Sequence, residues 1–174
     1  FLGLAAGFTI NANLKDLGPQ GLMKPGIAAV SIFAIANALG RVVWGTLIDR
    51  LSCAAATSGN LLSQALVLFL SLWLLRHPKG FLLFAFLTGF NYGGVLVLYV
   101  SSVAHIWGSG RVGQVYGWIF SSNILAAIFP MFAGYIYDLT GSFQLVLWGV
   151  SALLLLMASC MWRGRKMLEP LPSE

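Results

Sequence analysis

The chain has 174 residues, of which 59% are hydrophobic and only 9% are charged. Soluble domains carry about 25% charged residues, so this composition excludes an ordinary water-soluble enzyme. Two cysteines are too few for a disulfide scaffold, and the apolar content excludes a disordered chain. We therefore expect an all-α protein that crosses a membrane several times.

Apolar blocks follow one another along the sequence, and short charged connections separate them. A spanning helix needs about 20 apolar residues to cross about 30 Å of hydrocarbon. Five blocks are long enough, and the first starts so abruptly, without a signal peptide, that we expect a span whose beginning is missing. The predicted spans are 1–14, 26–48, 53–75, 80–104, 112–137 and 143–162, followed by a tail at 163–174.

The Lys and Arg residues give the expected orientation, because cytoplasmic loops are enriched in them. Six spans place both chain ends on one side, and the basic cluster of residues 163–166 favours a cytoplasmic C-terminus in a plasma or bacterial inner membrane. That side would hold Arg50, Arg111, Arg163, Arg165 and Lys166, against Lys15, Lys24, Arg76 and Lys79 opposite. A net charge of +5 then suits contact with anionic lipid headgroups, and no nucleic-acid motif is present.

The second and fifth predicted spans end alike, in Gly45-Thr46-Leu47-Ile48-Asp49 and Gly134-Tyr135-Ile136-Tyr137-Asp138. They occupy matching places in two successive triplets of spans. Because three is odd, the second triplet must cross the membrane in the opposite sense, as in the inverted repeats of secondary transporters. Chance is the alternative, since Gly and Asp are common at helix ends.

Arg41 is the one charged residue inside a predicted span, about 12 Å from the helix end at Asp49. Such a cation costs at least about 3 kcal/mol and usually marks a substrate or ion path. No span contains a carboxylate to neutralise Arg41, and its guanidinium fork suits a carboxylate ligand. We predict that Arg41 binds a small organic anion; an arginine that snorkels to the headgroups is the alternative.

Further polar and aromatic residues could complete a substrate-binding site around Arg41. Asn37 lies one turn before Arg41, and Asn123 lies about 18 Å inside the fifth span, at a similar depth. Either amide could instead bond a neighbouring helix. The aromatic candidates for the cavity wall are Tyr92, Tyr99 and Trp118, although core packing is the commoner role of such side chains. Gly93 and Gly94 would allow close approach and conformational change.

Several kinds of chemistry find no support in the sequence. His77 and His105 stand alone, Cys53 and Cys160 form no CxxC motif, and no catalytic triad or phosphate-binding loop is present. We therefore expect no metal, no cofactor and no enzymatic activity.

The segment from Gly40 to Arg50 resembles the loop motif of major facilitator superfamily transporters. Residues 89–141 are similar to the branch of oxalate:formate antiporters and related monocarboxylate carriers. The stretches that carry this likeness are Asn91-Tyr92-Gly93-Gly94, Tyr116-Gly117-Trp118 and Asp138-Leu139-Thr140-Gly141. The resemblance implies that the chain is the C-terminal six-helix half of a twelve-helix transporter, with the N-terminal half of the same parent chain as its partner.

The resemblance also implies secondary transport of a small carboxylate by alternating access, with Arg41 holding the anion and Asp49 and Arg50 in a cytoplasmic gate. The family's second cation would fall on or near Asn123, where this chain has none, which favours a monoanion over a dianion. A second positive charge supplied by the N-terminal half is the alternative. A carrier of a neutral or cationic solute is the nearest alternative. A six-span channel or structural membrane protein is another.

Overall fold

The computed structural model describes residues 1–18 and 23–165, and all regular elements in these ranges are helices. In chain order they are α1 (Leu2–Asn13), α2 (Met23–Ile48), α3 (Cys53–Phe69), α4 (Ser71–Leu74), α5 (Pro78–Trp107), the 3-10 turn η1 (Ser109–Arg111), α6 (Val112–Ala126), α7 (Phe129–Thr140) and α8 (Gln144–Arg163). The expectation of an all-α chain is confirmed.

Four helical stretches of the described chain are long and apolar enough to cross a membrane: Gly26–Ile48, Pro78–Trp107, Ser109–Thr140 and Gln144–Arg163. Helix α3 is also apolar but has 17 residues, which corresponds to about 26 Å. Leucine, isoleucine and tryptophan side chains stay exposed along α2, α6, α7 and α8. Apolar surface of this kind is stable against lipid chains and unstable against water.

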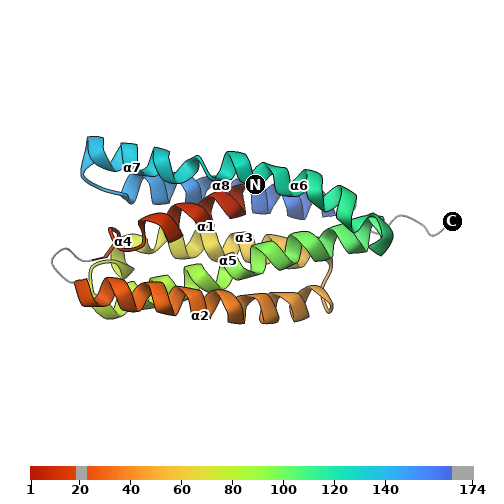
Figure 1. Cartoon of the computed structure of the whole chain (residues 1–174), viewed down its shortest axis with the longest axis horizontal. Helices are drawn as coiled ribbons and strands as arrows, with labels where there is room; N and C mark the ends of the chain where they lie inside the picture. The colour runs from red at the N-terminus through yellow and green to blue at the C-terminus, as the bar shows by residue number, and fades with distance from the viewer. Residues whose placement is uncertain (19–22, 166–174) are drawn as a thin grey trace.

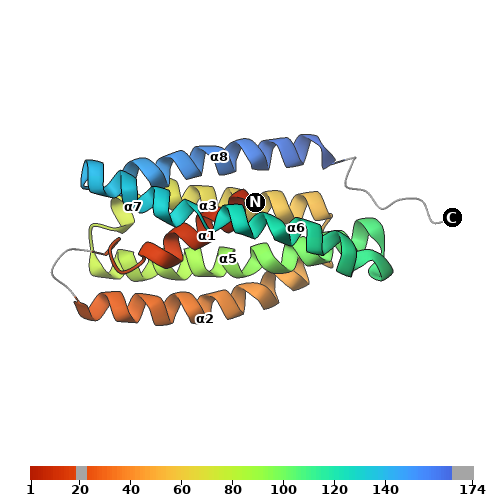
Figure 2. The ribbon, with the colours of Figure 1, turned by 45° about the horizontal axis from the view of Figure 1, so that its top comes forward.

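The helices lie side by side in an elongated bundle, and successive long helices run in opposite directions (Figure 1). Helices α2, α5 and α8 finish at one end of the bundle, whereas α1 and α7 finish at the other. The turned view in Figure 2 shows α2 along one edge with α5 next to it, and α8 along the opposite edge. The second and fifth spans therefore run antiparallel.

Some contacts between helices come in related pairs, each of which joins one of the first three predicted spans to one of the last three. Helix α2 packs on α5 as α7 packs on α1, and α3 packs on α5 as α8 packs on α1. Helix α3 also packs against α8. If the first three predicted spans are exchanged with the last three, the α2–α5 pair becomes the α7–α1 pair, and the α3–α5 pair becomes the α8–α1 pair. The α3–α8 pair stays the same under this exchange.

Two predicted spans are broken in the structure. The span expected at 53–75 is divided at Leu70, which lies between α3 and the short helix α4. The hydroxyl of Ser71, the first residue of α4, accepts a hydrogen bond of 3.0 Å from Gln144 Nε2. The span expected at 112–137 is divided between α6 and α7. Pro130 explains this second break, because it has no N–H for the carbonyl of Ala126 and its ring clashes with that carbonyl in a continuous helix.

Candidate functional site

Glycine residues bring α2 and α5 into direct backbone contact. A Cβ on Gly40 of α2 would overlap the carbonyl group of Phe90 on α5. In return, a Cβ on Gly93 would overlap the carbonyl oxygen of Asn37, and one on Gly89 would lie 2.5 Å from the carbonyl oxygen of Phe33. Small residues spaced four apart allow this approach between helices in membranes. We call this contact the α2–α5 seam.

Arg41 lies beside the seam on α2, with an exposed side chain. Its Nε–H donates a hydrogen bond of 3.2 Å to Oδ1 of Asn37, one helical turn earlier. Within the described residues Arg41 forms no ion pair. The hydrogen bond leaves the two terminal nitrogen atoms of the guanidinium available to a ligand.

Tyr92 connects this part of α2 to α5 and α1. Its ring centroid lies 6.0 Å from that of Phe8 on α1 and 6.0 Å from that of Phe33 on α2. A Cβ on Gly7 would overlap the Tyr92 ring, so α1 also approaches closely. Gly93, the residue after Tyr92, lies directly against the carbonyl oxygen of Asn37, and the Asn37 side chain holds Arg41. The structure thus brings together the predicted site residues Asn37, Arg41 and Tyr92.

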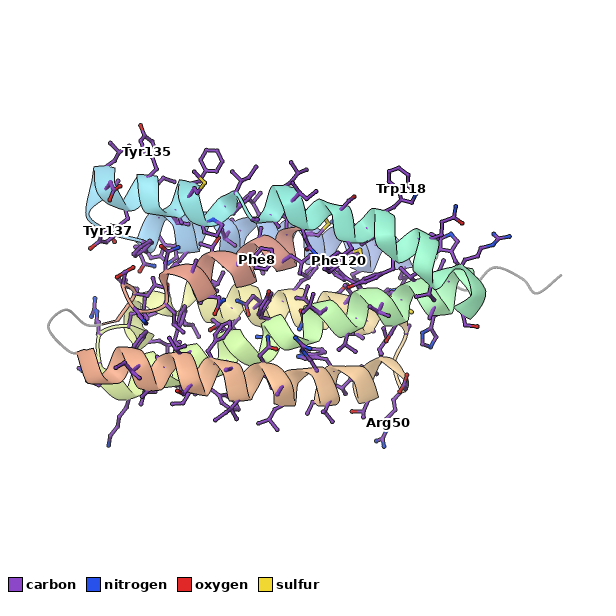
Figure 3. All side chains as sticks on the ribbon, viewed as in Figure 1. Phe8, Arg50, Trp118, Phe120, Tyr135 and Tyr137 are labelled. Atoms are coloured by element: carbon purple, nitrogen blue, oxygen red, sulfur yellow. The ribbon has the colours of Figure 1, made fainter. Side chains whose placement is uncertain are left out.

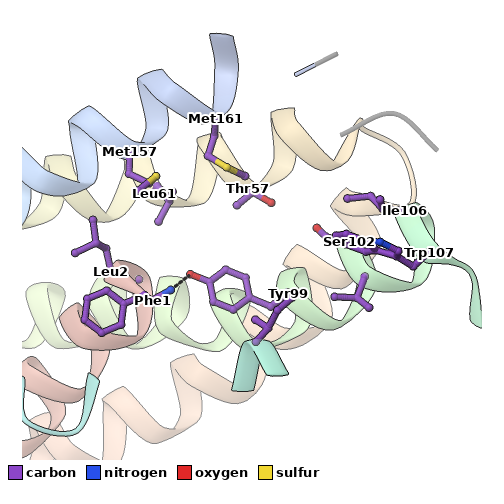
Figure 4. A pocket seen from close by; sticks show the side chains of 13 residues that line it. Phe1, Leu2, Thr57, Leu61, Tyr99, Ser102, Ile106, Trp107, Met157 and Met161 are labelled. Carbon is purple, nitrogen blue, oxygen red and sulfur yellow. Dashed lines mark hydrogen bonds between the residues drawn. The ribbon is translucent and has the colours of Figure 1, made fainter. Parts of the chain in front are cut away.

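The remaining predicted site residues lie elsewhere in the bundle. Tyr99 is half-buried at a largely apolar cavity of about 310 Å³, where its hydroxyl accepts a hydrogen bond of 3.5 Å from the Phe1 amino group (Figure 4). Trp118 is 78% exposed and points away from the bundle (Figure 3). Asn123 is half-buried on α6, and α5 lies between α6 and α2 in both ribbon views. The structure does not place these three side chains next to Arg41.

The residues predicted for the gate lie at or near the helix ends and the seam. Asp49 and Arg50 are exposed in the turn after α2. Figure 3 shows Arg50 at one end of the bundle. Gly94 follows the seam residue Gly93, and a Cβ on it would overlap the side chains of Trp44 and Asn60. Across residues 1–18 and 23–165, no group of three or more His, Cys, Asp or Glu side chains could hold a metal ion.

A buried polar cluster behind the seam escaped the sequence prediction. Asn60 Nδ2 of α3 donates a hydrogen bond of 3.0 Å to the carbonyl oxygen of Asn91, and Asn91 Nδ2 donates one of 3.0 Å to Ser63 Oγ. Asn60 and Asn91 are each 1% exposed. We call Asn60, Ser63 and Asn91 the amide clasp. The sequence did contain a signal for this cluster. The run 53–75 has no charged residue, but the polar residue Asn60 lies within it.

The comparison with protein families agrees with this architecture. The model of the Major Facilitator Superfamily matches residues 3–173, which is almost the whole chain. The chain belongs to the Major Facilitator Superfamily. As a member of this superfamily it is a multi-pass integral membrane protein of a transporter family, not of an enzyme family.

The chain is also similar to a curated protein, apicoplast pyruvate carrier 1 of Toxoplasma gondii. This facilitator-superfamily chain is 32% identical to that carrier over 96 residues, which are 53% of the chain and 17% of the carrier. The matched stretch is therefore a small part of the carrier's length.

Proposed function

We propose that the chain is part of a secondary transporter that moves a small monocarboxylate, such as pyruvate, across a membrane. The observation that carries this proposal is Arg41, a cation within a predicted membrane span whose Nε–H is held by Asn37 and which has no ion-pair partner in the described chain. The likeness to a pyruvate carrier supports the same substrate class.

The geometry around Arg41 suits a short organic acid. The terminal nitrogens of the guanidinium can donate two parallel hydrogen bonds to a carboxylate. The Tyr92 hydroxyl can supply a further hydrogen bond, and the rings of Phe8 and Phe33 beside Tyr92 offer apolar surface for the rest of the ligand. One cation neutralises one negative charge, which favours a monoanion. Asn123, Tyr99 and Trp118 would then contact substrate in other states or serve packing.

We further propose that this chain forms the C-terminal half of a twelve-helix carrier and contains an inverted repeat. The exchangeable packing of α2 on α5 and of α7 on α1 supports the repeat. The antiparallel course of the second and fifth spans supports it as well. An N-terminal half of the same parent would supply the opposite wall, and Asp49 and Arg50 would lie in a gate on the cytoplasmic side.

Substitution of Arg41 tests the proposed substrate class. In proteoliposomes that contain the full-length protein, we expect R41Q to lose exchange of labelled pyruvate, at least about a hundredfold, because no other cation of the described residues lies within a predicted span. R41K keeps the charge but not the fork, so it should retain a weakened activity. The matched control is R163Q, which removes an exposed arginine at the end of α8.

Full pyruvate exchange by R41Q would contradict the proposal. It would then favour a carrier of a neutral or cationic solute. Flux of R41Q that never saturates would instead indicate a channel.

A further inference from the structure

The amide clasp, described above, lies one layer behind the α2–α5 seam. Its hydrogen bonds run in both directions between α3 and α5, because Asn60 donates to the Asn91 backbone and Asn91 donates to Ser63. None of these three side chains forms a hydrogen bond with Arg41, and apolar residues would fill the same space without buried polar groups. We therefore looked for a role of the amide clasp other than contact with a ligand.

We propose that the amide clasp positions Arg41 for its anion by holding α5 at a defined place against α2. This inference rests on the proposed function. Asn60, Ser63 and Asn91 act here as positioning residues, since they reach the ligand through other groups.

The connection from the clasp to Arg41 consists of short contacts. Asn91 and Gly93 are two residues apart on α5, and Gly93 lies directly against the carbonyl oxygen of Asn37. The Asn37 side chain then accepts the Arg41 Nε–H at 3.2 Å. The step from Gly93 to Asn37 joins two backbones, with no flexible side chain between them to absorb a shift. A small displacement of α5 would therefore move Asn37 and turn the guanidinium.

A buried polar side chain on α3 does not by itself hold α5 in place. Gln64, on the same helix, shows this. Gln64 is 3% exposed, yet neither of its amide atoms has a hydrogen-bond partner in the described part of the chain. Gln64 lies one turn beyond Asn60 and next to Ser63 in sequence. It is thus a matched control, with the same burial, helix and chemistry but no bond to α5.

The test compares clasp variants with Gln64 variants in the full-length protein, reconstituted in proteoliposomes and supplied with pyruvate. We expect N91L and S63A to raise the concentration for half-maximal exchange roughly three- to tenfold, the effect of one interhelical hydrogen bond in a membrane. The maximal rate should stay within about twofold, because the change affects ligand binding. S63T keeps the hydroxyl and should behave like wild type, as should Q64L. The double variant S63A/N91L should be no weaker than N91L.

A second measurement reads Arg41 without transport. Phenylglyoxal modifies arginine, and mass spectrometry of the Arg41 peptide follows the rate of its modification. We expect N91L and S63A, but not Q64L, to change this rate and to raise the pyruvate concentration that protects Arg41.

Two results would overturn the positioning role. One is an equal effect of N91L and Q64L on half-saturation and on Arg41 modification. The other is a loss of maximal rate or folded protein at unchanged half-saturation, which would indicate a merely structural clasp. Failure of the proposed function would differ, because pyruvate would then not protect Arg41 even in the wild-type protein, while the modification rates would still report on the clasp.

Discussion

At the scale of single residues, Arg41 matters because of what stands one turn before it. Asn37 is a neutral amide, and its Oδ1 accepts a hydrogen bond from the arginine at 3.2 Å without cancelling the positive charge. A carboxylate at the same position would pair with the arginine, since oppositely charged residues four apart meet on a helix face. The amide thus orients the guanidinium and leaves its positive charge without an ion-pair partner among the described residues.

This reasoning predicts unequal losses of transport for two substitutions of Asn37. N37D should reduce pyruvate exchange at least about tenfold more than N37A does, because the new carboxylate competes with the substrate for Arg41. N37A should only raise the half-saturation concentration, by roughly three- to tenfold, through loss of one hydrogen bond to a charged group. Initial rates over a range of pyruvate concentrations measure both effects. Equal rates for N37D and N37A would show that the Arg41 charge does not select the substrate.

At the scale of helices, the α2–α5 seam depends on the absence of side chains. The contacts of Gly40 and Gly93 reach backbone atoms of the facing helix, which cannot rotate away as a side chain can. By contrast, Gly117 on α6 has open space where a Cβ would lie. The same substitution is therefore expected to have different effects at the two places.

We expect G93A to lower the free energy of unfolding by about 1–3 kcal/mol, the usual cost of overpacking. G117A should leave it unchanged or raise it by up to about 1 kcal/mol, because alanine favours a helix more than glycine does. Thermal unfolding of the purified full-length protein in detergent, followed by size-exclusion chromatography, compares the variants. An unchanged melting midpoint for G93A would mean that the space between α2 and α5 accommodates a Cβ at this position.

The two broken spans show which helix features a sequence reveals and which it hides. The break between α6 and α7 had a local signal in Pro130, although apolar length alone predicted a continuous span. The break at Leu70 had no comparable signal. It lies beside Ser71, whose hydroxyl meets Gln144 from a helix 73 residues further on. Contacts between distant segments of this kind cannot be derived from local pattern.

At the scale of the whole molecule, we expect the two ends of the bundle to face opposite sides of the membrane. Leu51 follows α2 at the end that also holds Arg50, and Thr140 ends α7 at the other end (Figure 3). Both residues are exposed. With a cytoplasmic C-terminus, the Leu51 end faces the cytoplasm.

Cysteine labelling tests this orientation. In a background with C53S and C160S, a membrane-impermeant maleimide added to intact cells should label T140C and leave L51C unlabelled. L51C should react only after permeabilisation, because the reagent cannot cross the bilayer. The reverse pattern would show that the C-terminus is outside.

Composition and apolar runs were enough to predict the protein class and most helices. Arg41 could be identified from the sequence because it is the one charged residue within a predicted span. The sequence did not predict which face of each helix turns toward the inside of the bundle. Trp118 shows why, because α6 is apolar around most of its circumference and nothing local indicates which face turns inward. The amide clasp was missed for a related reason, since its hydrogen bonds join residues about thirty apart that only the packed bundle brings together.

The glycine contact between α2 and α5 has a mechanical consequence. A Cβ on Gly40 or Gly93 would overlap the backbone of the facing helix, so the two helices already pack as closely as their backbones allow. Segments that pack closely open locally only at a high free energy. When the protein changes conformation, we expect α2 and α5 to move together as one rigid body that carries Arg41 with it.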